Sequence, residues 1–289
     1  MLTISTASEI NVLSKQVRRT GKRIGFVPTM GALHQGHLSL VRAARAQSDV
    51  VIVSIFVNPT QFGPKEDFSK YPRTLELDGV LLAEEEVDYV LTPSSAEMYA
   101  KDATTWVTVE GITDRLDGRS RPGHFRGVST VVAKLFHIVQ PDLAFFGQKD
   151  AAQVAIIRKM VRDLDFDVQI VVCPTVREAD GLAMSSRNAY LNAEQRKQAT
   201  VLHRSLLHVQ TLAGQGEKSA NALSAAGRRV ITEEPSVKLD YFEIVAPDTL
   251  EPVADTSVGA LVAVAAYVGE TRLIDNIVLP ANLPGKPHH

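Results

Sequence analysis

Short apolar runs alternate along the first part of this chain with longer segments in which apolar residues recur at helical spacing. Runs of strand length occupy residues 23–27, 50–57, 87–91, 143–146 and 168–172, and helical stretches include 128–139 and 151–164. Near-continuous apolar runs are typical of parallel strands, because helices then bury both faces of the sheet. The alternation therefore predicts an α/β fold with a doubly wound, Rossmann-like parallel sheet.

The pattern changes after a polar segment at residues 174–181. Beyond it we expect helices at 194–212 and 220–232, and strands at 238–245 and 260–268. A domain boundary is therefore placed near Ala183, between a first domain at 1–183 and a second, smaller α/β domain at 184–289. Residues 280–289 are rich in Pro and Gly and predict a flexible tail, and we assign no metal to His288 and His289 within it.

A glycine-rich turn follows the first apolar run, with the sequence Pro28-Thr-Met-Gly-Ala-Leu-His-Gln-Gly-His37. His34 and His37 lie three residues apart at the predicted start of a helix, so both imidazoles are expected on one side of the helix entrance. Free N–H groups and the helix dipole make such a position suitable for a phosphate. A histidine at a helix start is as often a cap or a packed ring, and the pattern alone leaves both interpretations open.

Polar side chains also follow two other predicted strands. Gln61 comes after the second run, and Gly147-Gln-Lys-Asp150 follows the run at 143–146. Gly147 is expected to permit a tight turn, Lys149 to offer a positive charge to phosphate, and Asp150 to cap the next helix, which carries Gln153. A surface lysine beside a cap is the alternative. Because ligands collect beyond the carboxyl ends of parallel strands, several such groups at one edge favour a binding site.

Six motifs occur in an order that resembles the pantothenate synthetase (pantoate:β-alanine ligase) family. They are PTMGALHxGH, SIFVNPxQF, YPRT, SRPGHFRGV, FFGQKD and MSSRNAYL, and the resemblance spans residues 25–191 and continues to 272–276. HxGH and MSSR on their own are similar to the HIGH and KMSKS-type signatures of the wider nucleotidyl transferase and class I aminoacyl-tRNA synthetase superfamily. Those two motifs indicate ATP chemistry without identifying the substrate.

The resemblance implies an AMP-forming carboxylate–amine ligase. ATP, carried with Mg²⁺, would adenylate (R)-pantoate and release pyrophosphate, and β-alanine would displace AMP from the pantoyl-adenylate to give pantothenate. An adenylyltransferase of the same superfamily acting on a phosphorylated acceptor is the alternative, and a non-catalytic nucleotide sensor also stays open. A tRNA-charging enzyme is disfavoured, because the sequence carries no appended basic domain.

The resemblance also implies roles for individual residues. His37 would be the proton donor, and His34, Lys149 and Arg187 would be the other catalytic groups. Gln61 and Gln153 would bind pantoate, Gln61 would also border β-alanine, and Asp78 would contact the metal or its water. The implied ATP-binding residues are Met30, Gly31, Ala32, Leu33, His34, Gln35, Gly36, His37, Gly147, Gln148, Lys149, Asp150, Val176, Met184, Ser185, Ser186 and Arg187.

Composition narrows the class of partner. A formal net charge of −2 argues against a general nucleic-acid surface. The single cysteine, Cys173, excludes an internal disulfide and is expected to be a packed side chain in a reducing compartment. The apolar runs are too short for a signal peptide or a membrane span, so a cytoplasmic protein without membrane partners is expected. The resemblance further implies a homodimer, and a C-terminal lid that closes on ATP.

Overall fold

The structure, a computed structural model, describes residues 1–64 and 66–281. Contacts divide the chain into two units, and several short segments alternate between them. The first unit contains Met1–Asp114, Arg121–Val176 and Met184–Ser186, and the second contains Arg115–Ser120, Arg177–Ala183 and the chain from Arg187 onward. The sequence placed one boundary near Ala183. In the structure, short segments on both sides of Ala183 belong alternately to the first and the second unit. The predicted tail, with His288 and His289, lies outside the described residues apart from residues 280 and 281.

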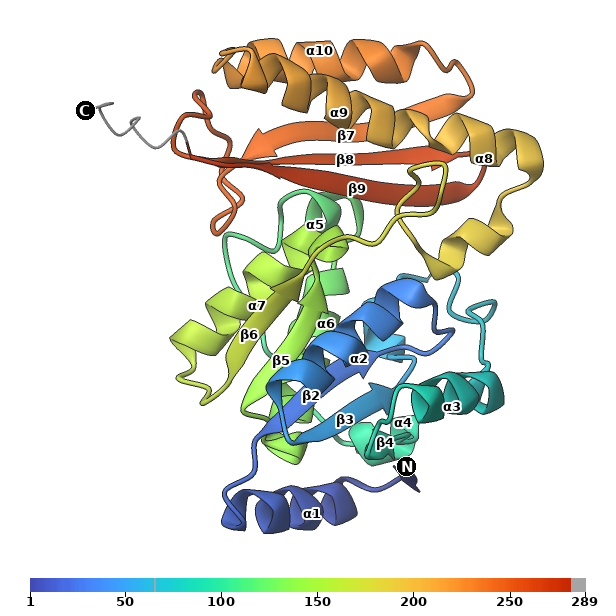
Figure 1. Cartoon of the computed structure of the whole chain (residues 1–289), viewed down its shortest axis with the longest axis vertical. Helices are drawn as coiled ribbons and strands as arrows, with labels where there is room; N and C mark the ends of the chain where they lie inside the picture. Colours follow the sequence, from blue (N-terminus) through green and yellow to red (C-terminus); the bar gives the residue numbers. More distant parts are fainter. Residues whose placement is uncertain (65, 282–289) are drawn as a thin grey trace. The chain divides into compact units, whose positions relative to one another are not determined.

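A six-stranded parallel sheet forms the first unit, and this confirms the predicted doubly wound α/β fold (Figure 1). After β4 the chain crosses to the other side of β2, so a topological switch point lies between β2 and β5. Ligands of open α/β sheets bind at such points, beyond the carboxyl ends of the strands. In spatial order the strands are β1 (Leu2–Ile4), β4 (Tyr89–Leu91), β3 (Val50–Ile55), β2 (Ile24–Thr29), β5 (Leu143–Gly147) and β6 (Gln169–Cys173).

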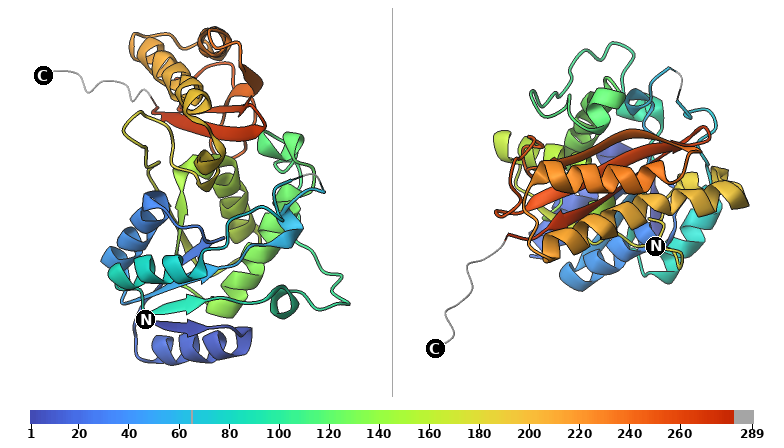
Figure 2. Two further views of the ribbon diagram at one scale, coloured as in Figure 1. Left: turned by 90° about the vertical axis from the view of Figure 1, so that its right-hand side faces the viewer. Right: turned by 90° about the horizontal axis from the view of Figure 1, so that it is seen from above.

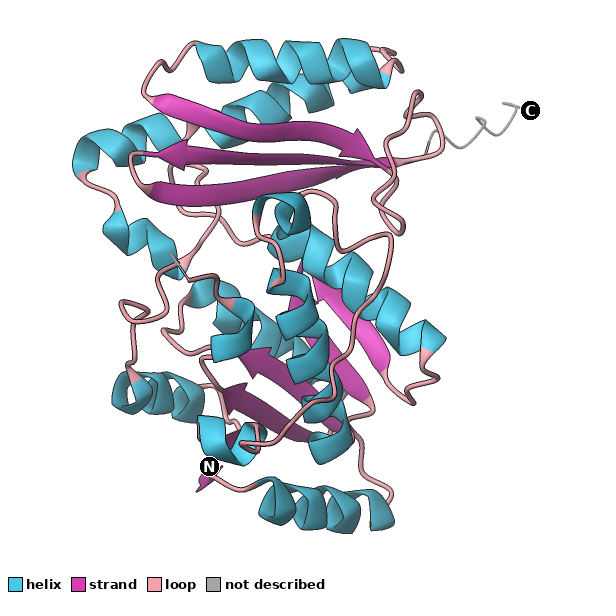
Figure 3. Cartoon of the chain, turned by 180° about the vertical axis from the view of Figure 1, so that it is seen from behind, coloured by secondary structure: helices cyan, strands magenta, loops and turns pink. Residues whose placement is uncertain are grey.

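Helices cover both faces of this sheet. The face seen in Figure 1 carries α2 and α3. The face seen from behind in Figure 3 carries α1, α6 and α7, and α6 packs against both α1 and α7. Short elements connect the layers. The helical segments of the first unit are α1 (Ala7–Arg19), α2 (Gln35–Gln47), η1 (Pro59–Gln61), α3 (Leu75–Glu84), α4 (Ser95–Met98), α6 (His124–Val139), η2 (Gln148–Asp150) and α7 (Ala151–Asp163).

Burial on both faces explains why the strands appear as continuous apolar runs in the sequence. Phe26 and Val27 of β2 are adjacent and point to opposite faces, yet both are fully buried. Val27 packs in one cluster with Val41 of α2 and Val53 of β3. Cys173 is a buried free thiol, as predicted.

The second unit is built on a three-stranded antiparallel sheet in the order β7 (Val237–Val245), β8 (Ala260–Val268) and β9 (Thr271–Leu279). Both views in Figure 2 show the helices α9 and α10 along one face of this sheet. The helices are α8 (Ala193–Ala199), α9 (Val201–Gly214) and α10 (Ala220–Thr232), and short segments α5 (Asp117–Ser120) and η3 (Ser186–Tyr190) complete the elements.

Two sequence expectations for the second part need correction. The single helix expected at 194–212 is two helices that meet at Thr200. The third strand, β9, was not expected, because Asp275 and Asn276 interrupt its apolar pattern although both are buried. Asp275 is buried against Arg177, whose guanidinium donates to both carboxylate oxygens at 2.6 and 3.0 Å. Within the described residues, no helix is long and apolar enough to cross a bilayer.

Candidate active site

The loop that follows β2 is held in an unusual conformation by a buried carboxylate. Gly31 and Ala32 have positive φ angles of 78° and 50°. The backbone N–H groups of Ala32 and Leu33 donate to the two oxygens of Asp78 at 3.0 and 2.9 Å, and the Thr74 hydroxyl adds a bond of 3.1 Å. Asp78 is 1% exposed. The first turn of α3 therefore fixes the loop that leads to the two histidines.

His34 and His37 lie together at the start of α2, as the spacing predicted. Their ring centroids are 4.1 Å apart. His34 is also the N-cap of α2, because its Nδ1 accepts the N–H of Gly36 at 3.1 Å. A Cβ at Gly36 would lie 2.8 Å from the His34 ring, so glycine is needed for the ring to cover this turn. His34 is therefore a helix cap, and its ring also lies on the same side of the helix start as that of His37.

The His37 ring is neutral at pH 7. Burial is the largest cause and His34 adds to it, and together they lower the pKa of His37 to about 3 although Asp150 acts in the opposite direction. Lys149 lies close enough for its charge to lower this pKa as well. The His37 Nδ1 atom is buried and has no hydrogen-bond partner within the described part of the chain. A buried imidazole with an unsatisfied nitrogen at a helix N-terminus is suited to an oxyanion ligand.

Gln61 lies at the carboxyl end of β3, the neighbour of β2. It ends the short helix η1 and is 9% exposed. Its amide is held on both sides, because Asn58 Nδ2 donates to Oε1 at 3.1 Å and Nε2 approaches Met30 Sδ at 3.1 Å. Asn58 is itself held by Tyr99, whose hydroxyl donates to Oδ1 at 2.8 Å. The Gln61 side chain is therefore presented in a defined orientation beside the loop after β2.

The GQKD turn lies at the carboxyl end of β5, on the other side of β2. Lys149 Nζ is 3.4 Å from Asp150 Oδ1. Two expectations are corrected here. Asp150 occupies the cap position of α7 but makes no side-chain capping bond, and Gly147 has an ordinary extended backbone with open space where a Cβ would be. Glycine at position 147 keeps that space clear, and Gln153 lies in the first turn of α7 beyond it.

Part of the MSSR segment belongs to the first unit. The Met184 N–H donates to the carbonyl of Val176 at 3.0 Å, and a Cβ at Gly36 would lie 3.7 Å from Met184 Cβ. Ser186 Oγ is 3.4 Å from the Tyr71 hydroxyl. Segments separated by about 150 residues in sequence therefore meet beside the histidine loop. Arg187 belongs to the second unit.

A metal role for Asp78 fits this arrangement poorly. Its two oxygens already accept two backbone N–H groups and one hydroxyl, and a cation would have to displace those donors. Across residues 1–64 and 66–281 no three His, Cys, Asp or Glu side chains gather to form a cation site. Mg²⁺ in nucleotide sites is held largely by phosphate oxygens and water, so a dedicated protein cage is not required.

Several residues around the site were not assigned from sequence. Asn58 could have been identified, because an Asn-Pro pair after a strand is a turn and cap signal. Glu66 carried no signal, since its partner Arg121 lies 55 residues away. In the structure Arg121 forms a two-bond pair with Glu66.

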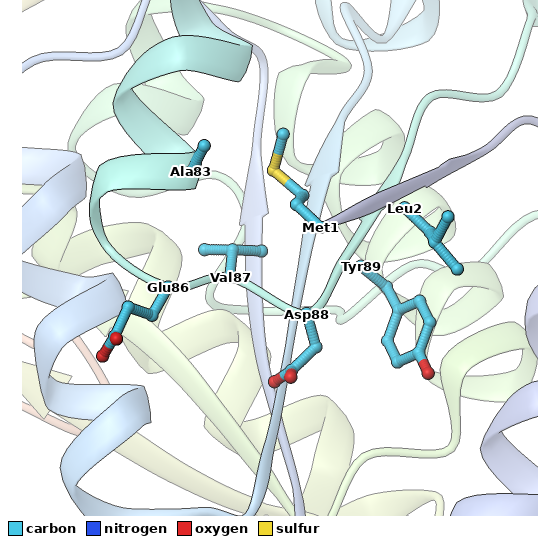
Figure 4. Close-up of a pocket in the computed structure, with 7 residues that line it drawn as sticks. All are labelled: Met1, Leu2, Ala83, Glu86, Val87, Asp88 and Tyr89. Atoms are coloured by element: carbon cyan, nitrogen blue, oxygen red, sulfur yellow. The ribbon is translucent and has the colours of Figure 1, made fainter.

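A separate hollow of about 400 Å³ lies at the amino ends of strands β1 and β4 (Figure 4). The start of β1, the end of α3 and the start of β4 line it, with Asp88 on one side. Asp88 has a structural role, because its carboxylate accepts from Arg45 and from the N–H of Val51. The polar groups described above lie at the carboxyl ends of the strands, so this hollow does not belong to their site.

Comparisons with known proteins identify the family to which this chain is similar. The family model described as pantoate-beta-alanine ligase matches residues 2–278. A pantothenate synthetase of Koribacter versatilis is 61% identical over 281 residues, which are 97% of each chain. The crystal structure of pantothenate synthetase from Thermus thermophilus has a TM-score of 0.91 and 48% identity, covering 96% of this chain and 99% of that one.

A third similar protein is the pantoate-beta-alanine ligase of Francisella tularensis, whose crystal structure is a complex with "Beta-gamma ATP" and β-alanine. It has a TM-score of 0.78 and 34% identity, and the match covers 96% of this chain and 97% of that one. The sheet, the histidine loop and the match along almost the whole length lead to one assignment. This chain belongs to the pantoate-beta-alanine ligase family.

Proposed function

We propose that this chain condenses (R)-pantoate with β-alanine at the expense of ATP, through a pantoyl-adenylate, releasing pyrophosphate and AMP. The substrates follow from family membership, and the ATP and β-alanine in the Francisella tularensis complex support them. One geometric observation supports the adenylating step. The buried Nδ1 of His37, which has no hydrogen-bond partner among the described residues, lies at the helix N-terminus at the switch point of the sheet, within range of the Lys149 charge.

In the first step a carboxylate oxygen of pantoate attacks the α-phosphorus of ATP, and the bond to pyrophosphate breaks. No protein nucleophile is required, so catalysis depends on orientation and on stabilising the charge that develops on phosphate oxygens. A neutral His37 donates a hydrogen bond to such an oxygen, and Lys149 supplies a positive charge. An anionic phosphate beside His37 would raise its pKa and so allow it to act as the proton donor.

In the second step the amine of β-alanine attacks the acyl carbon, the amide C–N bond forms, and the C–O bond to AMP breaks. The amine releases its proton to solvent. We assign Gln61 and Gln153 to pantoate and Gln61 also to β-alanine, because a primary amide can both donate and accept in one pocket. The backbone and side chains of 30–37, 147–150, 176 and 184–187 are assigned to ATP.

Four further parts complete this proposal, and the dimer among them rests on the family resemblance. ATP is taken up with Mg²⁺, the protein works as a homodimer, and the reaction takes place in the cytoplasm, where ATP is available. The part of residues 184–289 that begins at Arg187 acts as a lid and carries Arg187 towards the nucleotide. Light scattering of the purified protein tests the dimer, and a mass of about 31.5 kDa for the particle would contradict it.

A product assay tests the function directly. The purified chain is incubated with ATP, Mg²⁺ and pantoate, with and without β-alanine, and products are followed by mass spectrometry. We expect pantothenate and AMP only when β-alanine is present. A dinucleotide product with a phosphorylated acceptor would instead support the adenylyltransferase alternative.

A Lys149→Ala variant tests whether the reaction uses this site. Loss of one preorganised charge should lower single-turnover pyrophosphate release by roughly 100-fold to 1000-fold. The fold should be retained, because Lys149 pairs with Asp150, whose side chain is about half exposed, and ion pairs open to water contribute little to stability. An unchanged rate would remove Lys149 from the mechanism.

A further inference from the structure

We propose that Glu66, Arg121 and His124 form a chain of hydrogen bonds that positions Gln61 for its acid substrates. This inference rests on the proposed function, in which Gln61 binds pantoate and β-alanine. Glu66 lies in the loop after η1, whereas Arg121 lies just before α6 and His124 is the first residue of α6. They are positioning residues, since they act on substrate only through Gln61.

The first link is a paired ion contact. Arg121 Nε and Nη2 donate to the two oxygens of Glu66 at 2.7 and 2.6 Å. The exposed fractions of the two side chains are 16% for Arg121 and 26% for Glu66. Burial alone would raise the pKa of Glu66, but the hydrogen bonds and charge of Arg121 lower it overall. Two-bond pairs of this kind fix the plane of the guanidinium, which a single contact does not.

The second link determines the protonation of His124. Its Nδ1 lies 2.8 Å from the carbonyl oxygen of Gln61, and its Nε2 lies 3.0 Å from Arg121 Nη1. A carbonyl only accepts and a guanidinium only donates, so Nδ1 must carry the proton and Nε2 must be a bare acceptor. The contacts therefore require the neutral Nδ1–H tautomer of His124. Glu66 orients Arg121, Arg121 orients His124, and His124 donates to the peptide of Gln61.

The bond to the peptide completes the restraint of Gln61. The side-chain amide is held by Asn58 and lies against Met30, and the carbonyl is held by His124. Asn58 Nδ2 also donates to the carbonyl of Gly127, so the first turn of α6 is tied to η1 at two points. Release of the carbonyl would let the peptide rotate and would turn the amide away from its substrate.

The effect should be selective among the three substrates. The histidine loop is held independently by Asp78, so loss of the Glu66–Arg121–His124 chain should not disturb ATP. We expect Arg121→Lys to raise KM for pantoate and β-alanine about 10-fold, the effect of one weakened buried hydrogen bond. KM for ATP should stay within about twofold, because the substitution removes no hydrogen bond that holds the histidine loop.

Two histidine variants separate the links. His124→Asn keeps an amide donor near the position of Nδ1 but loses the acceptor for Arg121, and His124→Phe loses both while keeping a ring. KM for pantoate should rise more in His124→Phe than in His124→Asn. Arg45→Lys is the matched control, because Arg45 also forms a partly buried ion pair, with Asp88 at the amino end of β4 in the same sheet. It should leave all three KM values unchanged.

A spectroscopic measurement tests the same chain of bonds without substrate. Long-range ¹H–¹⁵N correlation on the full-length protein at pH 7.5 should show His124 as the neutral Nδ1–H tautomer. The Nε2–H tautomer or an imidazolium would overturn the proposal. Unchanged KM values in Arg121→Lys, with pantothenate formed by the unaltered protein, would also overturn it and leave the proposed function intact. Failure of the unaltered protein to form pantothenate with the expected tautomer present would reject only the function.

Discussion

The ring of His37 is kept neutral by burial and by the neighbouring His34, which lower its pKa from 6.5 to about 3. Between these two pH values the unfolded chain binds a proton at this position and the folded chain does not. The free energy of unfolding should therefore fall as the pH falls from about 6.5 towards 3. We expect His37→Gln to remove this part of the pH dependence, as measured by urea unfolding at pH 7.5 and pH 5.

His137→Gln is the control for that measurement, because His137 is exposed on α6 in the same unit. Its substitution should leave the difference in stability between the two pH values unchanged. The idea fails if His37→Gln has the same pH dependence as the unaltered protein. At pH 7.5 the same His37 variant should also release pyrophosphate roughly 100-fold to 1000-fold more slowly, as expected for a lost donor in a closed site.

Asp78, for which the resemblance implied a metal contact, supports the histidine loop in the structure through three hydrogen bonds. Asp78→Asn replaces one acceptor oxygen by an NH₂ group that faces a backbone N–H or the Thr74 hydroxyl. We expect the free energy of unfolding to fall by about 1–3 kcal/mol, the cost of an unsatisfied buried donor. Affinity for a non-hydrolysable ATP analogue, measured by calorimetry, should fall with it.

Glu76→Gln is the matched control, since Glu76 is exposed in the same first turn of α3. It should alter neither quantity. Normal stability of Asp78→Asn together with a higher Mg²⁺ requirement would favour the metal role over loop support.

At the level of elements, the approach of η1 to the first turn of α6 depends on Gly127. A Cβ there would overlap the carbonyl oxygen of Thr60 and would lie 2.7 Å from Gln61 Cα. Backbone therefore packs directly on backbone, and a methyl group cannot be accommodated without moving η1. This contact is what allows Asn58 and His124 to reach Gln61.

Gly127→Ala should therefore displace η1. We expect a loss of about 1–3 kcal/mol in the free energy of unfolding, as for other insertions into packed sites, and a higher KM for pantoate. Gly79→Ala is the comparison, because Gly79 is also helical and its added Cβ would meet nothing closer than 4.0 Å. That variant should be more stable by up to about 1 kcal/mol through its helix propensity. Equal behaviour of the two variants would contradict the steric argument.

At the scale of the whole chain, a segment from the middle of the sequence completes the second unit. Arg272 of β9 donates to Asp117 at 2.7 Å and to Asp240 at 2.8 Å. The side chains of Arg272 and Asp117 are 15% and 10% exposed. Burial alone would lower the pKa of Arg272, but the two carboxylates raise it overall, so the cation is fixed in this network.

Arg272→Met should leave the buried carboxylate of Asp117 unpaired. We expect a loss of about 3–5 kcal/mol in stability, as for other broken buried pairs, and faster proteolysis within residues 115–120. Arg229→Met, on the exposed side of α10, should change neither. If residues 115–120 of Arg272→Met were cleaved no faster than those of the unaltered protein, other contacts would hold this segment.

The sequence by itself determined the parallel sheet, because burial on both faces leaves continuous apolar runs, and it located the histidine loop and the GQKD turn at strand ends. It also located β7, β8 and α10, because β8 is apolar throughout, α10 has apolar residues at helical spacing, and β7 has enough apolar residues to indicate a strand despite the shift in register between Leu239 and Tyr241. Local spacing is sufficient for these features, since each depends on residues that are neighbours along the chain.

Tertiary structure alone decided which distant side chains meet. Asp78 accepts the N–H of Ala32, which lies 46 residues away in sequence, and Glu66 pairs with Arg121, which lies 55 residues away. The strand β9 was hidden because Asp275, a buried partner of Arg177, replaces an apolar residue in its pattern. Pairs of this kind leave no period in the sequence, because a charge is satisfied by a partner in space and not by one at a fixed spacing.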